Sequence, residues 1–458
     1  MDSTDCCRTN ISESRPDKLP TMAAGAAAAK VAAVAVFLAS LGLLLFAVVD
    51  IRRGFLLPAA AYAKVGAPSV LLYLNVWHLP LLLAGGVGLW LGYRLVARLH
   101  GTPEGMSRLV RVLAIGIVVL LVVDLFTYRA VPAARALAAG KLGVGQAIPY
   151  DALPPWVEPF GSAANYLLLV WHATVLGLLL GGLYLTVAPG IVSRLSGRGF
   201  VSHLAGSGAA LAQPFCSCCA APIGGSLYRA GASLGPVLAF TVSAPMLNIT
   251  GLILASALLP TQFAVLRIAG GVVVGVFVTY LVAIMARRWA AAAHESHETH
   301  ARWTSWAARA MDAYARLFRL EELVTGRRVD SPATLVTTWL GMTWRLARLV
   351  APVLFTGAVL AAALVRLMPS SGNTAWTVAA ASAVGTAFMI PTWTEIPLAA
   401  GMIDRGLTGP AAALLLTLPA VSIPCLAVLA GATRSAKAPL LLALLIMVLG
   451  MVAGLLFL

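Results

Sequence analysis

Three cysteines lie close together in the stretch "QPFCSCCAAPIGGSLYR", which runs from residue 213 to residue 229. Thiolates bind soft acceptors such as Cu(I), Zn²⁺ and trivalent arsenicals in preference to hard ones. In an extended chain Cys216 and Cys218 share one side and Cys219 faces the other, whereas a turn brings all three together. We interpret the cluster as a binding site for a soft solute or metal ion. The alternative is apolar packing, which we expect for the lone Cys425, because free cysteine is among the most buried residue types.

Two further polar residues stand in apolar surroundings close to prolines. Charged side chains inside a membrane are costly, and they often mark the path of a substrate or a proton. Glu395 is therefore a candidate for proton coupling or cation binding, with a structural hydrogen bond as the alternative. Asn248 follows Pro245 by three residues, so it could cap a broken helix or contact a substrate.

For the other ionisable residues in or near apolar segments, we prefer structural roles to functional ones. Asp124 lies late in an apolar segment, which indicates an interfacial position, and His172 lies in mid-segment, which favours an interhelical hydrogen bond over a proton relay. The tract "HESHETH" spaces His294, His297 and His300 at intervals of three, so these side chains could share a helix face and bind Zn²⁺ or Ni²⁺. A solvated linker is the interpretation we prefer for this tract.

The segments that carry these residues have the composition of a membrane protein. Of the 458 residues 60% are hydrophobic and 11% are charged, whereas about a quarter of a soluble domain is charged. Runs of about 20 apolar residues, the length that crosses a bilayer, recur along the chain. The sequence predicts an all-α polytopic membrane protein. Its ten predicted spanning helices lie near residues 25–49, 70–97, 109–128, 162–189, 233–259, 262–286, 340–367, 374–390, 408–432 and 438–458.

Arginine-rich loops set the predicted orientation in the plasma membrane. Loops of this kind stay in the cytoplasm, which predicts that both termini are cytoplasmic and that the loop "YDALPPWVEPF" lies outside. The same rule explains the net charge of +15 without any nucleic-acid partner. The first apolar run follows about twenty polar residues and has no cleavage motif, so we interpret it as a retained helix.

The chain divides into two membrane halves around a basic linker. In the linker, "ARWTSWAARAMDAYARLFRLEELV" predicts an amphipathic helix that lies on anionic lipid or docks against the protein itself. The predicted parts are a cytosolic tail (1–21), a first half (22–286) with a hairpin near 213–230, the linker (287–335), and a second half (336–458) with a hairpin near 390–406.

The two halves contain similar Pro/Gly-broken stretches, "CAAPIGGSLYRAGASLGPVLAFTVSAPMLN" and "TEIPLAAGMIDRGLTGPAAALLLTLPAVS". The matched breakers are Pro222 with Pro397, Gly235-Pro236 with Gly409-Pro410, and Pro245 with Pro419, and Pro214 and Pro391 precede the two copies. Irregular backbone at membrane depth is tolerated where it lines a cavity, so matched interruptions indicate a transporter's binding site. With re-entrant hairpins, the predicted orientation has both copies entering from the cytoplasm as a parallel repeat, and an inverted repeat is the alternative.

The run "PFCSCCAAPIGGSLYRAGASLGPVLAFTVSAPMLN" is similar to the signature of a bacterial family of predicted permeases with two such repeats, which includes the organoarsenical efflux permeases. The likeness extends from about residue 160 to the C-terminus and matches the family pattern from Pro214 to Cys218. Cys219 stands where glycine is commoner, and the second copy has Thr392 to Glu395 where efflux members carry a cysteine. The resemblance implies a permease fold with two such repeats, and we expect both broken hairpins to meet near the membrane midplane.

We therefore predict a secondary permease for a small soft or thiol-reactive solute, such as a metalloid or a transition-metal species, working in efflux. Glu395 is the candidate for coupling to protons, with cation binding as the alternative. No G-x-x-x-x-G-K-[ST] motif is present, which argues against a pump that binds ATP itself, and no cofactor is expected. One alternative is a membrane thiol oxidoreductase that uses Cys216, Cys218 and Cys219. The other is a membrane scaffold that recruits a partner through the linker helix.

Overall fold

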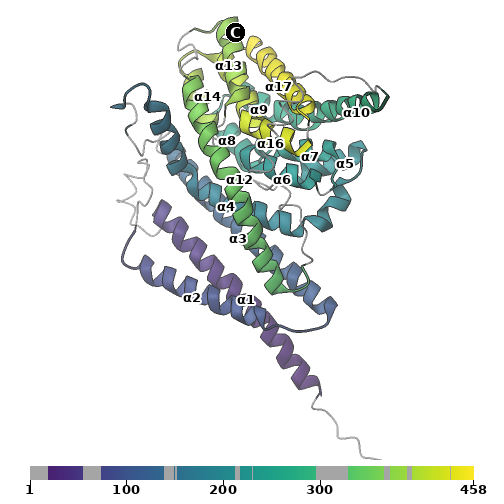
Figure 1. Ribbon diagram of the computed structural model, residues 1–458. Helices are drawn as coiled ribbons and strands as arrows, with labels where there is room; N and C mark the ends of the chain where they lie inside the picture. The colour runs from purple at the N-terminus through teal and green to yellow at the C-terminus, as the bar shows by residue number, and fades with distance from the viewer. Residues whose placement is uncertain are drawn as a thin grey trace, which may run out of the picture.

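The computed structural model describes residues 19–54, 74–138, 149, 152–211, 217–229, 231–295, 329–365, 372–388, 395–433 and 435–458. In these ranges every regular element is a helix, as predicted, and the helices pack into one elongated bundle (Figure 1). Within the described ranges, six helices are long and apolar enough to cross a membrane, or seven if the bent pair Thr408–Ala420 and Cys425–Thr433 forms one span. The predicted amphipathic helix of the linker lies outside the described residues.

The helices of the N-terminal part are α1 (Leu19–Arg53), α2 (His78–Ala97) and α3 (Pro103–Ala138). The next group is α4 (Glu158–Leu195), α5 (Phe200–Leu211), α6 (Ser217–Arg229), α7 (Leu234–Met246), α8 (Ile249–Leu258), α9 (Thr261–Val272), a π-helical turn η3 (Val273–Val278) and α10 (Thr279–Glu295). The last group is α12 (Pro332–Val365), α13 (Ala375–Ala387), α14 (Glu395–Ile403), α15 (Thr408–Ala420), α16 (Ile423–Thr433) and α17 (Lys437–Leu455).

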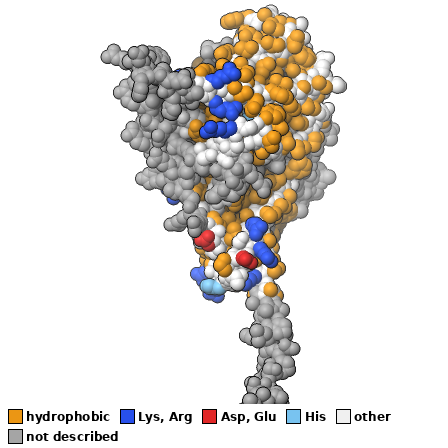
Figure 2. Space-filling view, turned by 90° about the vertical axis from the view of Figure 1, so that its right-hand side faces the viewer, with side chains coloured by type: hydrophobic (Ala, Val, Ile, Leu, Met, Phe, Trp, Pro, Cys, Tyr) orange, Lys and Arg blue, Asp and Glu red, His pale blue; other side chains and the backbone are white. Residues whose placement is uncertain are grey.

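The outer surface of the bundle is apolar, as a lipid-facing surface must be. Large hydrophobic side chains are exposed along one side of α2, including Leu83, Val87 and Trp90. Figure 2 shows hydrophobic side chains over most of the described part of one face, while Lys and Arg side chains gather in only a few groups. This distribution fits a multi-pass membrane protein, because the bilayer core accepts apolar side chains and excludes charged ones.

The prediction of a spanning helix at 374–390 is wrong, and a short helix at 200–211 was missed. Helix α13 has 13 residues and ends at Ala387, after which Phe388 has extended backbone, so it is shorter than the roughly 20 residues needed for a span. The helices α5 and α13 instead pack closely on α7 and α15. A Cβ at Gly206 of α5 would meet the backbone of Pro236, and one at Gly385 of α13 would meet Thr417.

The last two groups of helices have the same order, and several of their helix pairs correspond. Helices α4 and α12 pack against each other, α5 and α13 pack on α7 and α15, and α6 and α14 precede the broken pairs α7–α8 and α15–α16. The predicted first half also contained α1 to α3, which have no counterpart among the described helices of the second half. The matched unit of the first half therefore begins at α4.

The turns of the two hairpins lie at opposite ends of the continuous helix Thr261–Trp289. At the first turn, a Cβ at Gly235 would lie 3.4 Å from Ala283, near the end of that helix. At the second turn, Thr408 donates to the carbonyl of Phe457 (2.6 Å), whose ring lies 4.6 Å from that of Phe263 near its start. Positions 263 and 283 lie about 30 Å apart, because a helix rises about 1.5 Å per residue.

That separation matches the thickness of the hydrocarbon core, which is about 30 Å. The two hairpins therefore enter the bundle from opposite faces. This placement of the hairpin turns favours the inverted alternative over the parallel one. The reason is the shortness of α13: this helix returns with α14 to the side from which it came, so the second hairpin starts on the face opposite the first.

Candidate functional site

The first helix break lies between α7 and α8, at the end of a buried stretch that contains Pro245. Proline has no N–H, so this residue cannot complete the helical ladder. After the break, the Oδ1 atom of Asn248 accepts a hydrogen bond from the N–H of Gly251 (3.2 Å). Of the two roles predicted for Asn248, the structure shows the helix cap, with a side chain that is almost fully buried.

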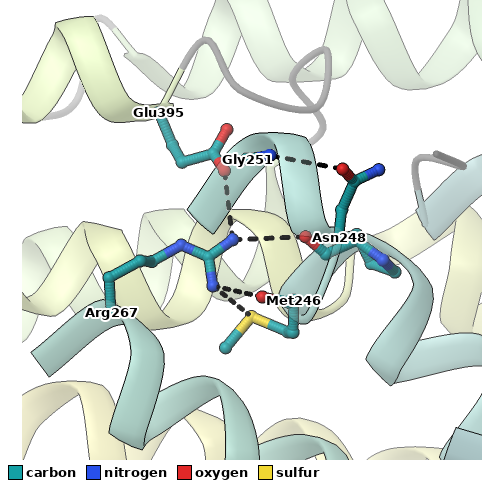
Figure 3. A network of polar contacts seen from close by, with 6 residues as sticks. Met246, Asn248, Gly251, Arg267 and Glu395 are labelled. Carbon is teal, nitrogen blue, oxygen red and sulfur yellow. Dashed lines mark hydrogen bonds and ion pairs between the residues drawn. The ribbon is translucent and has the colours of Figure 1, made fainter. Parts of the chain in front are cut away.

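The carbonyls exposed by this break receive hydrogen bonds from Arg267 of α9 (Figure 3). Its Nη1 atom donates to the carbonyl of Met246 (2.7 Å), and its Nη2 atom donates to that of Pro245 (3.2 Å). The guanidinium is 1% exposed, so these acceptors replace the water it would otherwise bind. Arg267 thus stabilises the broken backbone and brings a positive charge into the core.

The partner of this charge is Glu395, the first residue of α14. Its Oε1 atom lies 3.3 Å from Nη2 of Arg267, and its side chain is fully buried. The second oxygen, Oε2, makes no hydrogen bond within the described part of the chain. Glu395 therefore makes the structural hydrogen bond that was one of its two predicted roles. Its other oxygen, Oε2, is buried and can accept a further hydrogen bond.

The second helix break lies between α15 and α16, after Pro419. Here Val421 is extended (φ −146°, ψ 170°), and Ser422 precedes α16. The hydroxyl of Ser422 lies 3.5 Å from that of Ser217, the first residue of α6. Ser422 follows Pro419 by three residues, as Asn248 follows Pro245, so the two polar residues occupy equivalent positions.

Each break is therefore contacted from the hairpin of the other half. Helix α6 of the first hairpin meets the second break through Ser217 and Ser422, whereas α14 of the second hairpin meets the first break through Glu395 and Arg267. The cysteine cluster is adjacent in the sequence to Ser217, which makes the contact with Ser422. Cys216 directly precedes Ser217 and lies outside the described residues. Cys218 and Cys219 belong to the first turn of α6.

The remaining predicted site residues are placed as follows. Helix α6 contains Pro222 and helix α14 contains Pro397, while Gly235-Pro236 and Gly409-Pro410 lie in the first turns of α7 and α15. Cys425 is buried in α16, as packing requires. His294 lies at the end of α10, whereas Pro214, Pro391, His297 and His300 lie outside the described residues. Within the described residues, no three metal-binding side chains come together.

The predicted hydrogen bond of His172 is confirmed, because its Nε2 atom lies 3.1 Å from Oδ2 of Asp124 on α3. Asp124 itself is buried, because its side chain is only 5% exposed and α3 packs against α4. Its interfacial position stays a prediction. A second buried pair, Asp50 with His78 (2.8 Å), joins α1 to α2, and the sequence analysis missed it.

Arg267 is the central residue that the sequence analysis missed. Its signal was available, because it is an arginine six residues into the apolar segment predicted at 262–286. Ionisable residues at such positions mark functional or structural pairs by default. Its partner could not be read from the sequence, since Glu395 lies 128 residues further along the chain.

The comparisons with known proteins agree with this architecture. The family model ArsP_1, described as "Predicted permease", matches residues 162–458. The chain is 32% identical over 335 residues to UPF0718 protein YraQ of Escherichia coli (strain K12), which covers 71% of this chain and 87% of that protein. It is 25% identical over 289 residues to UPF0718 protein MJ0584 of Methanocaldococcus jannaschii, which covers 52% of this chain and 78% of that protein. No solved structure matches the chain significantly.

Proposed function

Because the chain belongs to the ArsP_1 family of predicted permeases, we propose that it is a secondary permease whose substrate binds between the two helix breaks. The observation that carries the proposal is the crossing of the halves. Broken helices in corresponding positions of two halves are the usual site of binding in secondary transporters. In this chain each break is also contacted by the other half, through Ser217 and Ser422 on one side and Arg267 and Glu395 on the other.

This arrangement can couple the movements of the two halves during transport. Alternating access moves one half against the other around a fixed site. A movement of α14 relative to α9 would change the distance between Glu395 and Arg267. It would also alter the hydrogen bonds that Arg267 donates to the carbonyls of Pro245 and Met246. Substrate binding and helix geometry are therefore coupled through one buried ion pair.

The proposed cargo is a small soft or thiol-reactive solute, such as a trivalent organoarsenical or a transition-metal species, carried outward. Thiolates select such species. In the sequence, Cys216 precedes Ser217, and Cys218 and Cys219 follow it. Glu395 is the proposed proton carrier. Protonation of the carboxylate would weaken its attraction for Arg267 and release α14, which links proton binding to movement of the hairpin.

The proposed location is the plasma membrane with the N-terminus in the cytoplasm. If α5–α6 and α13–α14 are re-entrant pairs, the crossings are α1, α2, α3, α4, α7–α8, α9–α10, α12, α15–α16 and α17, an odd number. The C-terminus then lies on the outer face, in contrast to the prediction from the loops. The contact of Phe457 with Phe263, far from the arginine-rich end of α10, supports this placement.

Transport into everted membrane vesicles tests the cargo and the site together. The panel contains a trivalent methylarsenical, arsenite, Cu(I), Zn²⁺ and a sulfur oxyanion. The wild type is compared with the triple variant Cys216→Ser/Cys218→Ser/Cys219→Ser, and the buried Cys425→Ser is the matched control. We expect one soft species to accumulate with the wild type and the control but not with the triple variant.

Two other results would redirect the proposal. Wild-type transport by the triple variant would leave the cysteines a packing role. No transport of any solute, with normal expression, would favour the oxidoreductase or scaffold hypotheses. Proton coupling is tested in the same vesicles with a pH-sensitive dye: the substrate should release a proton gradient in the wild type and should fail to do so in Glu395→Gln.

A further inference from the structure

A pocket of about 530 Å³ opens away from the helix breaks, where the α4–α5 connection, the α6–α7 turn and α10 meet. The lining side chains that matter for its chemistry are Arg198, His203, Tyr228, Ser233, Tyr280 and Arg287. None of the residues at the two breaks lines it. The pocket therefore lies at the turn of the first hairpin, on the face from which that hairpin enters.

The charge of this pocket is positive. Arg198 and Arg287 both line it, and no Asp or Glu does so among the described residues. Arg287 is fixed in place, because Nη1 donates to the carbonyl of Arg198 (2.8 Å) and Nε donates to that of Ala283 (3.3 Å). Interfacial arginines often only reach toward water, so charge alone does not make a site. A held guanidinium at the wall of a cavity is better prepared to bind an anion.

The N-terminus of α7 faces the same pocket. Leu234 and Gly235, the first residues of this 13-residue helix, line it. Ser233 does not cap the helix with its side chain, because its hydroxyl donates to the carbonyl of Ser196 instead (2.6 Å). The partial positive charge of the helix end is therefore turned toward the pocket, where an anion would be stabilised.

A buried histidine supplies an independent sign of a ligand. His203 is 1% exposed, and its Nε2 atom is occupied by the carbonyl of Val276 (2.9 Å) and the hydroxyl of Thr279 (3.1 Å). Its Nδ1 atom lies beside Gly235 but makes no hydrogen bond of normal geometry within the described chain. A buried nitrogen without such a bond is destabilising unless a ligand or a water molecule supplies the missing hydrogen bond.

With Nε2 donating to the carbonyl of Val276, Nδ1 of a neutral His203 is an acceptor. A ligand for this pocket therefore needs negative charge for the two arginines and a hydroxyl group to donate to the ring. We propose that the pocket binds a hydrogen phosphate group, either as inorganic phosphate or as the headgroup of phosphatidic acid. Sulfate has the charge and the shape but lacks the hydroxyl at neutral pH, so it binds more weakly.

Bound phosphate would join three separate segments: the α4–α5 connection through Arg198, the first turn of α7, and α10 through Arg287. The hairpin turn and the end of α10 would then be held together. This site is independent of the proposed cargo site, so it can exist whether or not the soft solute is transported.

The test is equilibrium binding of ³²P-labelled phosphate to the purified full-length protein in neutral detergent, at constant ionic strength. We expect saturable binding to the wild type, competed by unlabelled phosphate and only weakly by sulfate. Binding should weaken about tenfold or more in Arg198→Gln/Arg287→Gln, because each lost bond joins charged partners. The matched control is Arg288→Gln, which removes a neighbouring arginine that does not line the pocket.

The single variant Arg198→Gln covers the case in which the double variant does not fold, since the side chain of Arg198 is exposed and makes no hydrogen bond or ion pair within the described residues. It should also weaken binding. The source of the phosphate is distinguished in lipid nanodiscs, where phosphatidic acid should displace the labelled phosphate if the headgroup is the ligand. Equal binding by all variants, or no specific binding in either detergent or nanodiscs, would overturn the proposal.

Discussion

The Nη2 atom of Arg267 lies 3.3 Å from Oε1 of Glu395, in a part of the protein where both side chains are almost fully buried. The cation comes from the half that contains the first helix break, and the carboxylate comes from the other half. The same Nη2 atom also donates to the carbonyl of Pro245. The guanidinium of Arg267 therefore links the two halves and also donates a hydrogen bond to a carbonyl at the helix break of the first half.

This pair should show strong coupling in a double-mutant cycle. Removing one member of a buried pair leaves an uncompensated charge and costs about 3–5 kcal/mol. We expect Arg267→Met to destabilise more than Glu395→Met, because the arginine also serves the carbonyls of Pro245 and Met246. The double variant should lose less stability than the sum of the two single losses. Thermal unfolding in detergent measures this, and additive losses would show that the pair is not coupled.

The hydroxyls of Ser217 and Ser422 predict a crosslink between the halves. Because they lie 3.5 Å apart, cysteines at both positions should form a disulfide on mild oxidation in a chain that lacks its native cysteines. The crosslinked peptide is detected by mass spectrometry after proteolysis. The pair Ser40→Cys with Ser422→Cys is the control, since α1 and α16 do not pack together. A failure to crosslink would show that α6 does not contact the second helix break.

Glycine spacing should decide how closely α5 packs on α7. A side chain at Gly206 would meet the backbone of Pro236, whereas a side chain at Gly208 of the same helix meets no atom within 4 Å. Gly206→Ala should therefore cost about 1–3 kcal/mol through overpacking. Gly208→Ala should be neutral or should stabilise by up to about 1 kcal/mol, as alanine does in helices. Equal melting temperatures for the two variants would contradict the close packing.

The inverted arrangement predicts opposite accessibility of the two hairpin ends. Gly199, beside the first turn, and Asp404, at the second turn, are both exposed. In a cysteine-free chain, Gly199→Cys should react with a membrane-impermeant maleimide from one face only, and Asp404→Cys from the other face only. The labelling is compared in right-side-out and everted vesicles. Reaction of both cysteines from the same face would restore the parallel arrangement.

Much of the fold could be predicted from local sequence. The apolar runs predicted helices, and prolines at 245 and 419 marked both breaks, because proline removes a donor wherever it occurs. Asn248 lies directly after the first break, whereas Glu395, which was placed in the second hairpin, meets that break only through Arg267. Local sequence failed at α13, where the apolar run is long enough to suggest a span but the helix stops at Ala387. Hydropathy shows whether a segment can lie in the bilayer core. It does not show whether the packing of neighbouring helices lets the segment cross the whole membrane.

The sequence by itself determined that this chain is helical, lies in a membrane and breaks its backbone at two matched places. The physical reason is local: lipid leaves no partner for free backbone groups, so apolar runs form helices, and only proline and glycine interrupt them. The tertiary structure decided which break meets which hairpin and from which face each hairpin enters. Those relationships join residues 128 and 205 positions apart, and they depend on how whole helices pack.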